Sequence, residues 1–396
     1  MNATADNLFT IVTPEYAALN ELRRCVEACD FAGYDPYDAL NSPVLRLLAG
    51  GSKWARLLAI QAVKRFPFNL RPLLLYRPGH NPKALGLFLE GYVRLHRSGH
   101  RGARARIASL LDLLERQCRR HGSGHGWGYN FDWQSRVFFV PRGLPNGACT
   151  SFVGHALLDT WETLHEQRAL DLAVPIAQFL MCELNRVREG DAFCFSYTPV
   201  DTYAVHNVNL LCASLLIRLY TVLGDSTLRD TALSALTYSM KHQQGNGSWY
   251  YSERTGFRWI DSFHTGFNLE SIRRFLRLGQ ALEHRQAYYG GREFYVRNLF
   301  LPDGSPKYFH DRLYPIDIHS GAEAISFFSA EPACRGLARR VLSWVLANMY
   351  DGNGRFYFQK HKRLTNRIAY VRWSQAWMFR ALTAYLETAP ERCAAI

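Results

Sequence analysis

Apolar residues recur along most of this chain in stretches of helical length, and loops rich in glycine and aromatic residues separate these stretches. The stretch 104–120 is an example, because its leucines at positions 110, 111, 113 and 114 give it one apolar face. No region is rich in strand patterns, although the short alternation at 355–359 is compatible with a small hairpin inside a loop. The pattern therefore predicts an all-α chain.

One loop-and-helix unit recurs from about Trp127 onward. Its clearest copy is Gly247–Tyr251, followed by Trp259–Gly266 and a helical run. At intervals of 56, 58, 55 and 54 residues, inner helices are expected to begin near Thr150, His206, His264, His319 and Trp373. A repeat of this length holds two helices of about 15 residues with their loops. With a sixth inner helix at 81–94, the six hairpins predict an (α/α)6 toroid; the periodicity also allows an open solenoid.

The rest of the chain fits around these hairpins. Ser42 as a cap and Pro43 at the first helical position predict a helix that runs to about residue 65. Four prolines between 67 and 82 predict an extended connection over 66–80. No long linker is present, so residues 1–396 are expected to form a single toroid domain, with 1–30 as an N-terminal extension and first helix. Further outer helices are expected near 14–29, 104–120, 165–189, 222–244, 279–300 and 331–349.

Charge is distributed unevenly along the chain. The net charge is +13, yet no acidic residue occurs between 39 and 89. Such a segment attracts polyanions or an acidic membrane surface, and a solvated helix face is the alternative. Nucleic acid is not an expected partner, because zinc-finger, RNP and basic heptad signatures are missing from the sequence. The basic residues of the segment are Arg46, Lys53, Arg56, Lys64, Arg65, Arg71, Arg77 and Lys83.

Localisation is inferred from hydropathy and cysteine usage. The longest apolar run, Val208–Leu223, is interrupted by Arg218, so a membrane span is not expected. Residues 1–13 lack the basic start and apolar core of a signal peptide. The nine cysteines contain no CxxC pair, which favours reduced thiols. We therefore expect a cytoplasmic protein, with peripheral contact to an anionic membrane surface or a lipid-linked glycan.

The loops that enter the inner helices are expected to carry the chemistry. In a toroid the inner helices run parallel, so their N-termini meet at one mouth, where the helix dipoles favour anionic groups. Aromatic faces with polar edges suit sugar rings, and simple packing within the loops is the alternative for each residue. The aromatic candidates are Trp127, Tyr129, Trp133, Tyr197, Trp249, Tyr250, Tyr251, Trp259, Tyr308, Tyr314, Tyr357 and Trp373.

Carboxylates occupy related places before four inner helices. Glycoside hydrolysis needs two carboxylates on opposite sides of the scissile bond, so two of these four are predicted to act as acid and base. Helix capping and loop bracing are the alternatives. The four are Asp132, Asp201, Asp261 and Asp317, and Glu253, Asp311 and Glu323 lie near the same loops.

Histidines fall at matching positions on three consecutive hairpins, namely His206, His264 and His319, with Cys149 near the corresponding place on the hairpin before. A histidine can serve as general acid, general base or metal ligand. No short-range ligand spacing supports zinc, so no metal and no cofactor are expected. The three histidines are predicted to hold or protonate a sugar, with a structural role as the alternative.

Basic residues near the same loops can pair with carboxylate, phosphate or sulfate groups, although an ordinary surface role is the alternative for each. They are Arg136, Lys307, Arg312, Arg367 and Arg372. The full set of predicted substrate-binding residues is Trp127, Tyr129, Arg136, Tyr197, Trp249, Tyr250, Lys307, Tyr308, His310, Arg312, Tyr314, Arg372 and Trp373.

The runs 127–134, 196–199, 205–211, 259–268 and 307–319 resemble a bacterial family from exopolysaccharide and capsule biosynthesis clusters. The resemblance covers most of the chain and implies surface-polysaccharide assembly or modification on a six-hairpin glycosidase-like scaffold. Members are often labelled aminolevulinate dehydratases, a label that does not suit this chain, because it has no alternating strand–helix pattern and no cysteine-rich zinc loop. The signatures of sugar 2-epimerases are not cleanly present.

These observations together predict a carbohydrate-active enzyme of exopolysaccharide production. The leading hypothesis is acid/base cleavage of a glycosidic bond in an acidic or lipid-linked glycan. A uronate C5-epimerase or polysaccharide lyase is the first alternative, in which an arginine neutralises the carboxylate and a histidine or tyrosine removes the C5 proton. A non-catalytic glycan-binding or assembly protein is the second.

Overall fold

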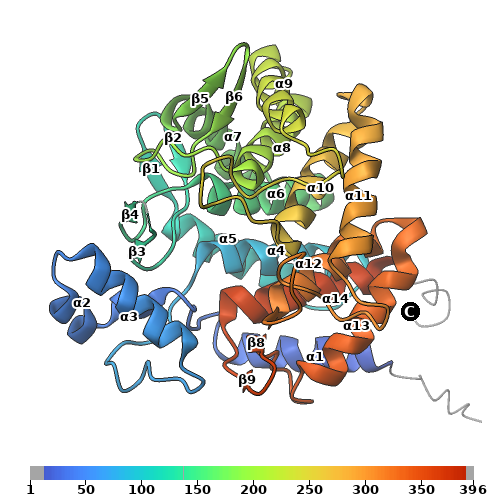
Figure 1. Ribbon diagram of the computed structural model, residues 1–396. Helices are drawn as coiled ribbons and strands as arrows, with labels where there is room; N and C mark the ends of the chain where they lie inside the picture. Colours follow the sequence, from blue (N-terminus) through green and yellow to red (C-terminus); the bar gives the residue numbers. More distant parts are fainter. Residues whose placement is uncertain (1–12, 137, 389–396) are drawn as a thin grey trace, which may run out of the picture.

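Six helices form a closed inner ring in the computed structural model, which describes residues 13–136 and 138–388 (Figure 1). Each inner helix packs against the next, and the last also packs against the first. This final contact closes the ring, so the predicted all-α (α/α)6 toroid is confirmed. The inner helices are α4 (Pro82–Arg97), α6 (Gly147–Leu164), α8 (His206–Leu223), α10 (Ser262–Arg277), α12 (Ile318–Ser329) and α14 (Ala376–Thr388).

A second layer of helices covers the ring. Every residue of α12 is buried, whereas the outer helix that follows it buries one face. The difference arises because an inner helix contacts two neighbours, an outer helix and the ring axis, while an outer helix also meets water. The outer helices are α1 (Pro14–Ala28), which packs on α14, and α5 (Ala103–Gln117), α7 (Gln167–Gln178), α9 (Ser226–Lys241), α11 (Arg285–Asn298) and α13 (Arg335–Asn348), each on the inner helix before it.

By length and composition alone, helix α8 could cross a membrane. It is the one helix in the described part of the chain that meets this criterion. The ring explains this composition, because 72% of the apolar stretch is buried inside the protein.

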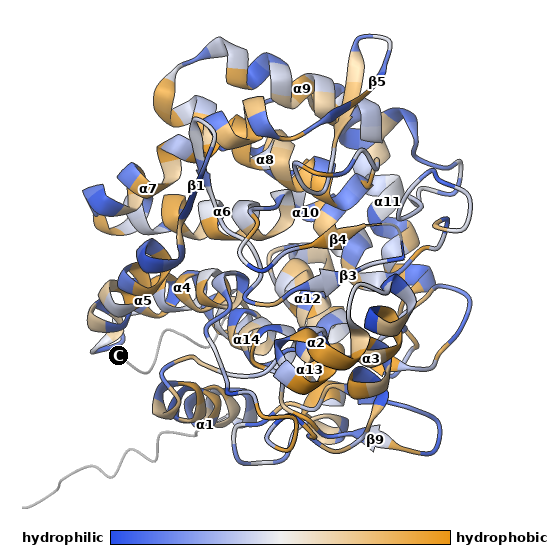
Figure 2. Cartoon of the chain, turned by 90° about the vertical axis from the view of Figure 1, so that its left-hand side faces the viewer, coloured by the Kyte–Doolittle hydropathy of each residue, from blue (hydrophilic) through white to orange (hydrophobic). Residues whose placement is uncertain are grey.

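The expected single helix from Pro43 to residue 65 is wrong. Gly50 adopts a φ of +50°, a left-handed conformation that ends the first helix. Two helices result, α2 (Pro43–Ala49) and α3 (Lys53–Arg65). Their main contacts are with each other and with the short helix η1 (Asp38–Asn41), so the pair projects from one side of the ring (Figures 1 and 2).

The predicted helix 165–189 ends early. A π-turn, η2 (Phe179–Glu183), follows α7, and the chain then forms the hairpin β5 (Arg186–Glu189) and β6 (Ala192–Phe195). The helix predicted to reach residue 120 likewise gives way to the hairpin β1 (Arg119–His121) and β2 (Gly124–Gly126). The remaining short strands are β3 (Trp133–Gln134), β4 (Phe139–Val140), β7 (Ile316–Asp317), β8 (Gln359–Lys360) and β9 (Thr365–Asn366).

The starts of four inner helices are fixed by side-chain caps that accept hydrogen bonds from first-turn N–H groups. The caps are Asn81, Asn146, Asp261 and Asp317. Capping holds the first turn of each helix in place, and these first turns build the site described next.

Candidate active site

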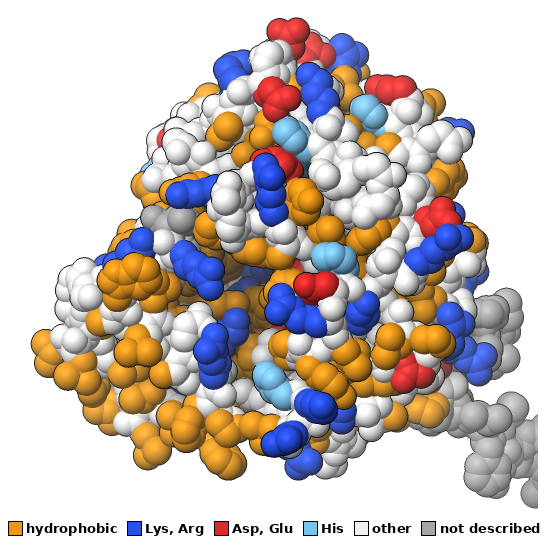
Figure 3. Space-filling model, in the orientation of Figure 1, with side chains coloured by type: hydrophobic (Ala, Val, Ile, Leu, Met, Phe, Trp, Pro, Cys, Tyr) orange, Lys and Arg blue, Asp and Glu red, His pale blue; other side chains and the backbone are white. Residues whose placement is uncertain are grey.

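The first turns of the inner helices and the loops that lead into them enclose a cavity of about 850 Å³. This volume lies within the range of ligand-binding sites. Figure 3 shows the face on which the cavity opens, with basic side chains around a central hollow. All six inner segments contribute, through Lys83 (α4), Ala148 (α6), Asn207 (α8), His264 (α10), His319 (α12) and Arg372 in the π-turn η5 (Val371–Gln375) before α14.

Asp261 and His264 form a hydrogen-bonded pair at the start of α10. Asp261 Oδ1 caps the helix by accepting from the backbone N–H of His264, at 3.0 Å. Its Oδ2 lies 2.7 Å from His264 Nδ1 and also accepts from Trp259 Nε1. Because a carboxylate accepts hydrogen bonds and does not donate them, Nδ1 carries the proton. In the neutral imidazole Nε2 is therefore unprotonated, and His264 lines the cavity.

His319 lines the same cavity one hairpin further along the chain. It is 1% exposed, and neither of its ring nitrogens has a hydrogen-bond partner within residues 13–136 and 138–388. Burial lowers the pKa of His319 well below its usual value, so the imidazole is neutral near pH 7. An unpaired polar side chain this deeply buried is costly, and a bound ligand would supply the missing hydrogen bonds.

Phe263 holds the two histidines near each other. Its ring stacks on His319 at a centroid distance of 4.4 Å and lies 4.3 Å from His264. The two imidazoles are therefore separated by no more than one aromatic side chain. Trp377 of α14 also packs on His319, with ring centroids 4.3 Å apart.

Two buried cations line the cavity close to the histidines. Lys83 is 5% exposed, and its Nζ lies 4.1 Å from the centre of the Phe152 ring. No described carboxylate forms an ion pair with it, and burial together with Arg372 lowers its pKa to about 7. Arg372 is held by two hydrogen bonds to Asp35, at 2.5 and 2.8 Å. Of the described residues that line the cavity, Asp261 alone carries a carboxylate, so the lining is strongly positive.

Aromatic side chains form much of the remaining wall. Tyr251 and Trp259 stack with their planes 10° apart, and the hydroxyl groups of Tyr129 and Tyr197 lie 2.7 Å from each other. Trp373 packs edge-on against His319. Rings with polar edges are suited to a sugar, as the sequence predicted. The structure thus places these predicted residues at the cavity: Asp261, His264, His319, Tyr129, Arg136, Tyr197, Tyr308, Arg372 and Trp373.

The other three aspartates of the predicted acid/base set do not line the cavity. Asp132 accepts from the backbone N–H of Arg142, and Asp201 accepts four hydrogen bonds within its own loop. Asp317 is fully buried, and its Oδ1 accepts a hydrogen bond from Trp373 Nε1 at 2.8 Å. Burial raises the pKa of Asp317 to about 6. Bracing and capping occupy these carboxylates, which was the alternative for each.

His206 is also directed away from the cavity, although it too lies in the first turn of an inner helix: it is the first residue of α8, whereas His264 is the third residue of α10. Its Nδ1 lies 3.1 Å from Ser239 Oγ and its Nε2 lies 3.1 Å from Glu253 Oε1. Both nitrogens are therefore engaged by the outer helix and the loop. The two neighbouring hairpins place chemically identical residues in different environments.

Two predicted aromatic residues join the loops to the outer helices. Trp127 Nε1 donates to the carbonyl of Leu114 in α5, and Trp249 Nε1 donates to the carbonyl of Ser239 in α9. Both rings are buried. Each therefore satisfies a carbonyl near the C-terminal end of an outer helix, a structural role that the repeat reproduces in both hairpins.

The last predicted binding residues lie on the loops outside the cavity lining. Lys307 Nζ donates to the carbonyls of Asn298 and His310, which joins the loop to the end of α11. Arg312 is exposed and stacks on the ring of Phe309 at 4.4 Å. The structure does not bring Lys307, His310, Arg312, Tyr314 or Tyr250 to the cavity.

Sequence reasoning missed several cavity residues, above all Lys83, Asn207 and Phe263. Lys83 was recognised only as one of eight basic residues, yet it lies two residues after the cap Asn81. That position in the first turn of an inner helix was the available signal. Asn207 directly follows His206, and its Oδ1 is buried without a partner.

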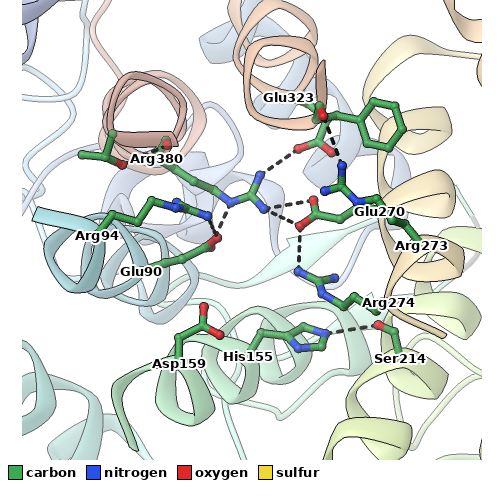
Figure 4. Close-up of polar contacts among 12 residues, drawn as sticks. Glu90, Arg94, His155, Asp159, Ser214, Glu270, Arg273, Arg274, Glu323 and Arg380 are labelled. Carbon is green, nitrogen blue, oxygen red and sulfur yellow. Dashed lines mark hydrogen bonds and ion pairs between the residues drawn. The ribbon is translucent and has the colours of Figure 1, made fainter. Parts of the chain in front are cut away.

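Beneath the cavity, a network of buried ion pairs fills the ring axis (Figure 4). Arg380 donates to Glu90 at 2.8 Å, to Glu270 at 2.8 and 2.9 Å, and to Glu323 at 3.2 Å. These residues lie one to two turns further into α4, α10, α12 and α14 than the cavity residues. Arg380 also lies 5.4 Å from the ring of Trp377, so that ring separates the network from His319.

Metal binding finds no support in the geometry. Within residues 13–136 and 138–388, no group of three or more histidine, cysteine, aspartate or glutamate side chains is placed to hold an ion.

No family model and no curated protein sequence matches the chain. Solved structures do match it in fold. The cellobiose 2-epimerase from Bacillus thermoamylovorans aligns with a TM-score of 0.60 at 14% identity, over 78% of this chain and 87% of that one. A GH76 α-mannanase from Bacteroides thetaiotaomicron aligns at 0.58 and 11%, over 77% and 85%. A D-mannose isomerase aligns at 0.57 and 9%, over 78% and 86%.

These likenesses show the fold. The six-hairpin toroid is shared by proteins named as an epimerase, an isomerase and a mannanase, so the fold does not select among reactions. The reaction must therefore be inferred from the cavity, which is lined by two histidines, two buried basic residues and one carboxylate.

Proposed function

We propose that this protein is a carbohydrate-active enzyme that transfers a proton at a carbon atom of an acidic sugar. The observation that carries this proposal is the pair of histidines in contact with the Phe263 ring, one oriented by Asp261 and the other buried with both ring nitrogens unpaired among the described residues. Such a pair suits epimerisation, isomerisation or lyase chemistry, in which a base removes a proton next to a carbonyl or carboxylate.

His264 is assigned as the base. Its Nε2 takes the proton, and the electrons of the C–H bond move into the adjacent C=O group to give an enediolate. Asp261 keeps the imidazole in one tautomer and compensates the positive charge that it gains. When a second proton donor on the opposite face of the sugar returns a proton to the same carbon, the product is an epimer. When the proton held by His264 returns to the neighbouring carbon, the product is an isomer.

His319 is assigned as the partner group. Because it is neutral, one nitrogen carries a proton and can donate a hydrogen bond to the oxygen on which negative charge develops. The other nitrogen accepts. No protein group competes for either nitrogen in the described part of the chain, so both are available to the substrate.

The positive lining supports an acidic substrate. Lys83 and Arg372 lie at the depth of the histidines, and Lys64, Arg65 and Arg136 lie in the outer wall. A sugar carboxylate near Lys83 would give this buried ammonium group the ion-pair partner that the protein does not provide. Neutralising that carboxylate would also acidify the neighbouring C–H bond. The aromatic wall and the sugar enzymes among the fold neighbours support a carbohydrate as the substrate.

Glycosidic-bond cleavage, the leading hypothesis from the sequence, is the second candidate. The mannanase among the fold neighbours favours it. Cleavage by a carboxylate pair needs two carboxyl groups facing one bond, and Asp261 is the one carboxylate among the described residues that line the cavity. We also propose, on the sequence resemblance, that the substrate is a glycan of cytoplasmic exopolysaccharide production.

The test is incubation of the full chain in D₂O with uronic acids, uronic-acid oligomers, cellobiose and mannose, followed by NMR. Proton transfer predicts deuterium at the carbon next to the carboxylate or carbonyl of the acidic sugars. New reducing ends with neither deuterium nor an unsaturated sugar would instead assign hydrolysis of the glycosidic bond. Saturable binding with neither change would contradict an enzymatic role and leave a glycan-binding protein.

A further inference from the structure

The α2–α3 pair carries an unusual concentration of exposed apolar side chains. Sixteen large hydrophobic side chains are exposed in the described chain, and nine of them lie between residues 44 and 75. Leu47 is 82% exposed, Leu48 76% and Trp54 73%. Contiguous exposed apolar surface on this scale marks a binding face, because folding gains nothing from it. The nine are Val44, Leu47, Leu48, Trp54, Leu58, Phe66, Phe68, Leu73 and Leu75.

These exposed side chains are not needed for the core of the helix pair. Ile60 and Val63 of α3 already pack with Ala39 and Leu40 in a small core of their own. Trp54 and Leu58 lie one turn apart on the outward side, and Val44, Leu47 and Leu48 form the corresponding face of α2. Both helices are thus apolar on the side that faces water, and Figure 2 shows their high content of hydrophobic residues. Figure 3 shows hydrophobic side chains gathered at the lower left, where Figure 1 places α2 and α3.

The charge around the apolar face is of one sign. Arg46, Lys53, Arg65 and Arg77 are exposed, and the sequence from 39 to 89 contains no acidic residue. Leucine, tryptophan and phenylalanine bordered by lysine and arginine form the composition of interfacial membrane segments. A second copy of this chain fits less well, because a two-fold interface would bring the same basic residues face to face.

We propose that α2, α3 and the loop that follows them insert into the surface of an anionic phospholipid bilayer. The apolar side chains enter the acyl boundary, and the basic residues contact lipid phosphate groups. The face adjoins the cavity, because Trp54, Leu58 and Arg65 belong to both. Membrane contact through this face places the cavity opening beside the bilayer. If the proposed function holds, the substrate that the site can reach is therefore a lipid-linked acidic glycan.

The test uses the full chain with vesicles of phosphatidylcholine alone and of phosphatidylcholine with phosphatidylglycerol at about 7:3. We expect the wild type to sediment with the anionic vesicles. The double variant Leu47→Glu, Leu48→Glu should bind them at least ~10-fold more weakly, because both side chains lose their place in the acyl boundary. The matched control is Leu223→Glu, Leu282→Glu, which changes two exposed leucines elsewhere and should bind as the wild type does.

Two further readouts keep the outcome unambiguous. Trp54 fluorescence, isolated as the difference between wild type and Trp54→Phe, should shift to the blue on anionic vesicles. The Leu47→Glu, Leu48→Glu variant should retain its deuterium exchange on a soluble acidic sugar, so membrane binding and activity are tested separately. Equal vesicle binding by this variant and the wild type would overturn the proposal. So would a dimer in light scattering that the same variant abolishes, with no vesicle binding.

Discussion

The same inner helices provide two contrasting environments along the ring axis. One to two turns into α4, α10, α12 and α14, a single arginine, Arg380, is bonded to three glutamates. In the first turns, Lys83 has no ion-pair partner and neither ring nitrogen of His319 has a hydrogen-bond partner among the described residues. Both environments are buried, so burial alone does not separate them. We interpret the ion-paired network as structural, and the unpaired imidazole and ammonium groups that line the cavity as the place of a ligand.

The largest expected effect on stability is that of Arg380→Met. Removing the guanidinium leaves Glu90, Glu270 and Glu323 buried together without their shared cation, which costs on the order of 3–5 kcal/mol in the free energy of unfolding. Chemical denaturation followed by circular dichroism measures this. Arg297→Gln, which breaks an exposed pair with Glu293, is the control and should cost about 0.5 kcal/mol or less. A loss below about 1 kcal/mol for Arg380→Met would show that the network is not structural.

Lys83→Met should have the opposite effect at the other end of the axis. Because no described carboxylate pairs with this cation, its removal should leave the free energy of unfolding unchanged or raise it by about 1 kcal/mol. The KM for an acidic sugar should rise at least ~10-fold, while a neutral sugar is unaffected. Isothermal titration and steady-state kinetics separate the two effects. Destabilisation comparable to that of Arg380→Met would place Lys83 with the structural network instead.

The pH dependence of kcat/KM should sharpen the same contrast. Lys83 has a pKa of about 7, so it is charged below that value and neutral above it. Affinity for an anionic sugar is therefore complete at about pH 6 and should fall by about tenfold between pH 7 and 8.5. In Lys83→Met this decline should disappear. Stability moves the other way, because between pH 7 and the pKa of an unfolded lysine the unfolded chain binds more protons, which makes the Lys83 contribution rise with pH.

Much of this fold could be predicted from the sequence. The spacing of the loop-and-helix repeat is a covalent property of the chain, so the six inner helices and their approximate starts followed from it. Ring closure was predicted from the number of repeats together with the family resemblance, and the structure confirmed it. The break at Gly50 was missed, because a glycine within an apolar run can be helical or left-handed, and only the packing of α2 on α3 decides.

The site was harder to predict, because residues in the first turns of different inner helices do not have equal surroundings. His206 and His264 both fall in the first turn of an inner helix, yet the outer helix provides Ser239 as a partner for one and the loop provides Asp261 for the other. Asp201 and Asp261 likewise precede inner helices, but the hydrogen bonds inside one loop occupy Asp201 completely. Such partners come from residues 30 or more positions away or from loop geometry, which periodicity does not contain.

The most direct measurement compares deuterium exchange in His264→Gln and His206→Gln under the same conditions. We expect kcat for exchange to fall by about 10²–10⁴-fold in His264→Gln, because the base is lost, and by only a few fold in His206→Gln. Both variants should keep the circular dichroism spectrum of the wild type. Equal losses in the two variants, or full exchange in His264→Gln, would contradict the assignment of the cavity histidine as the base.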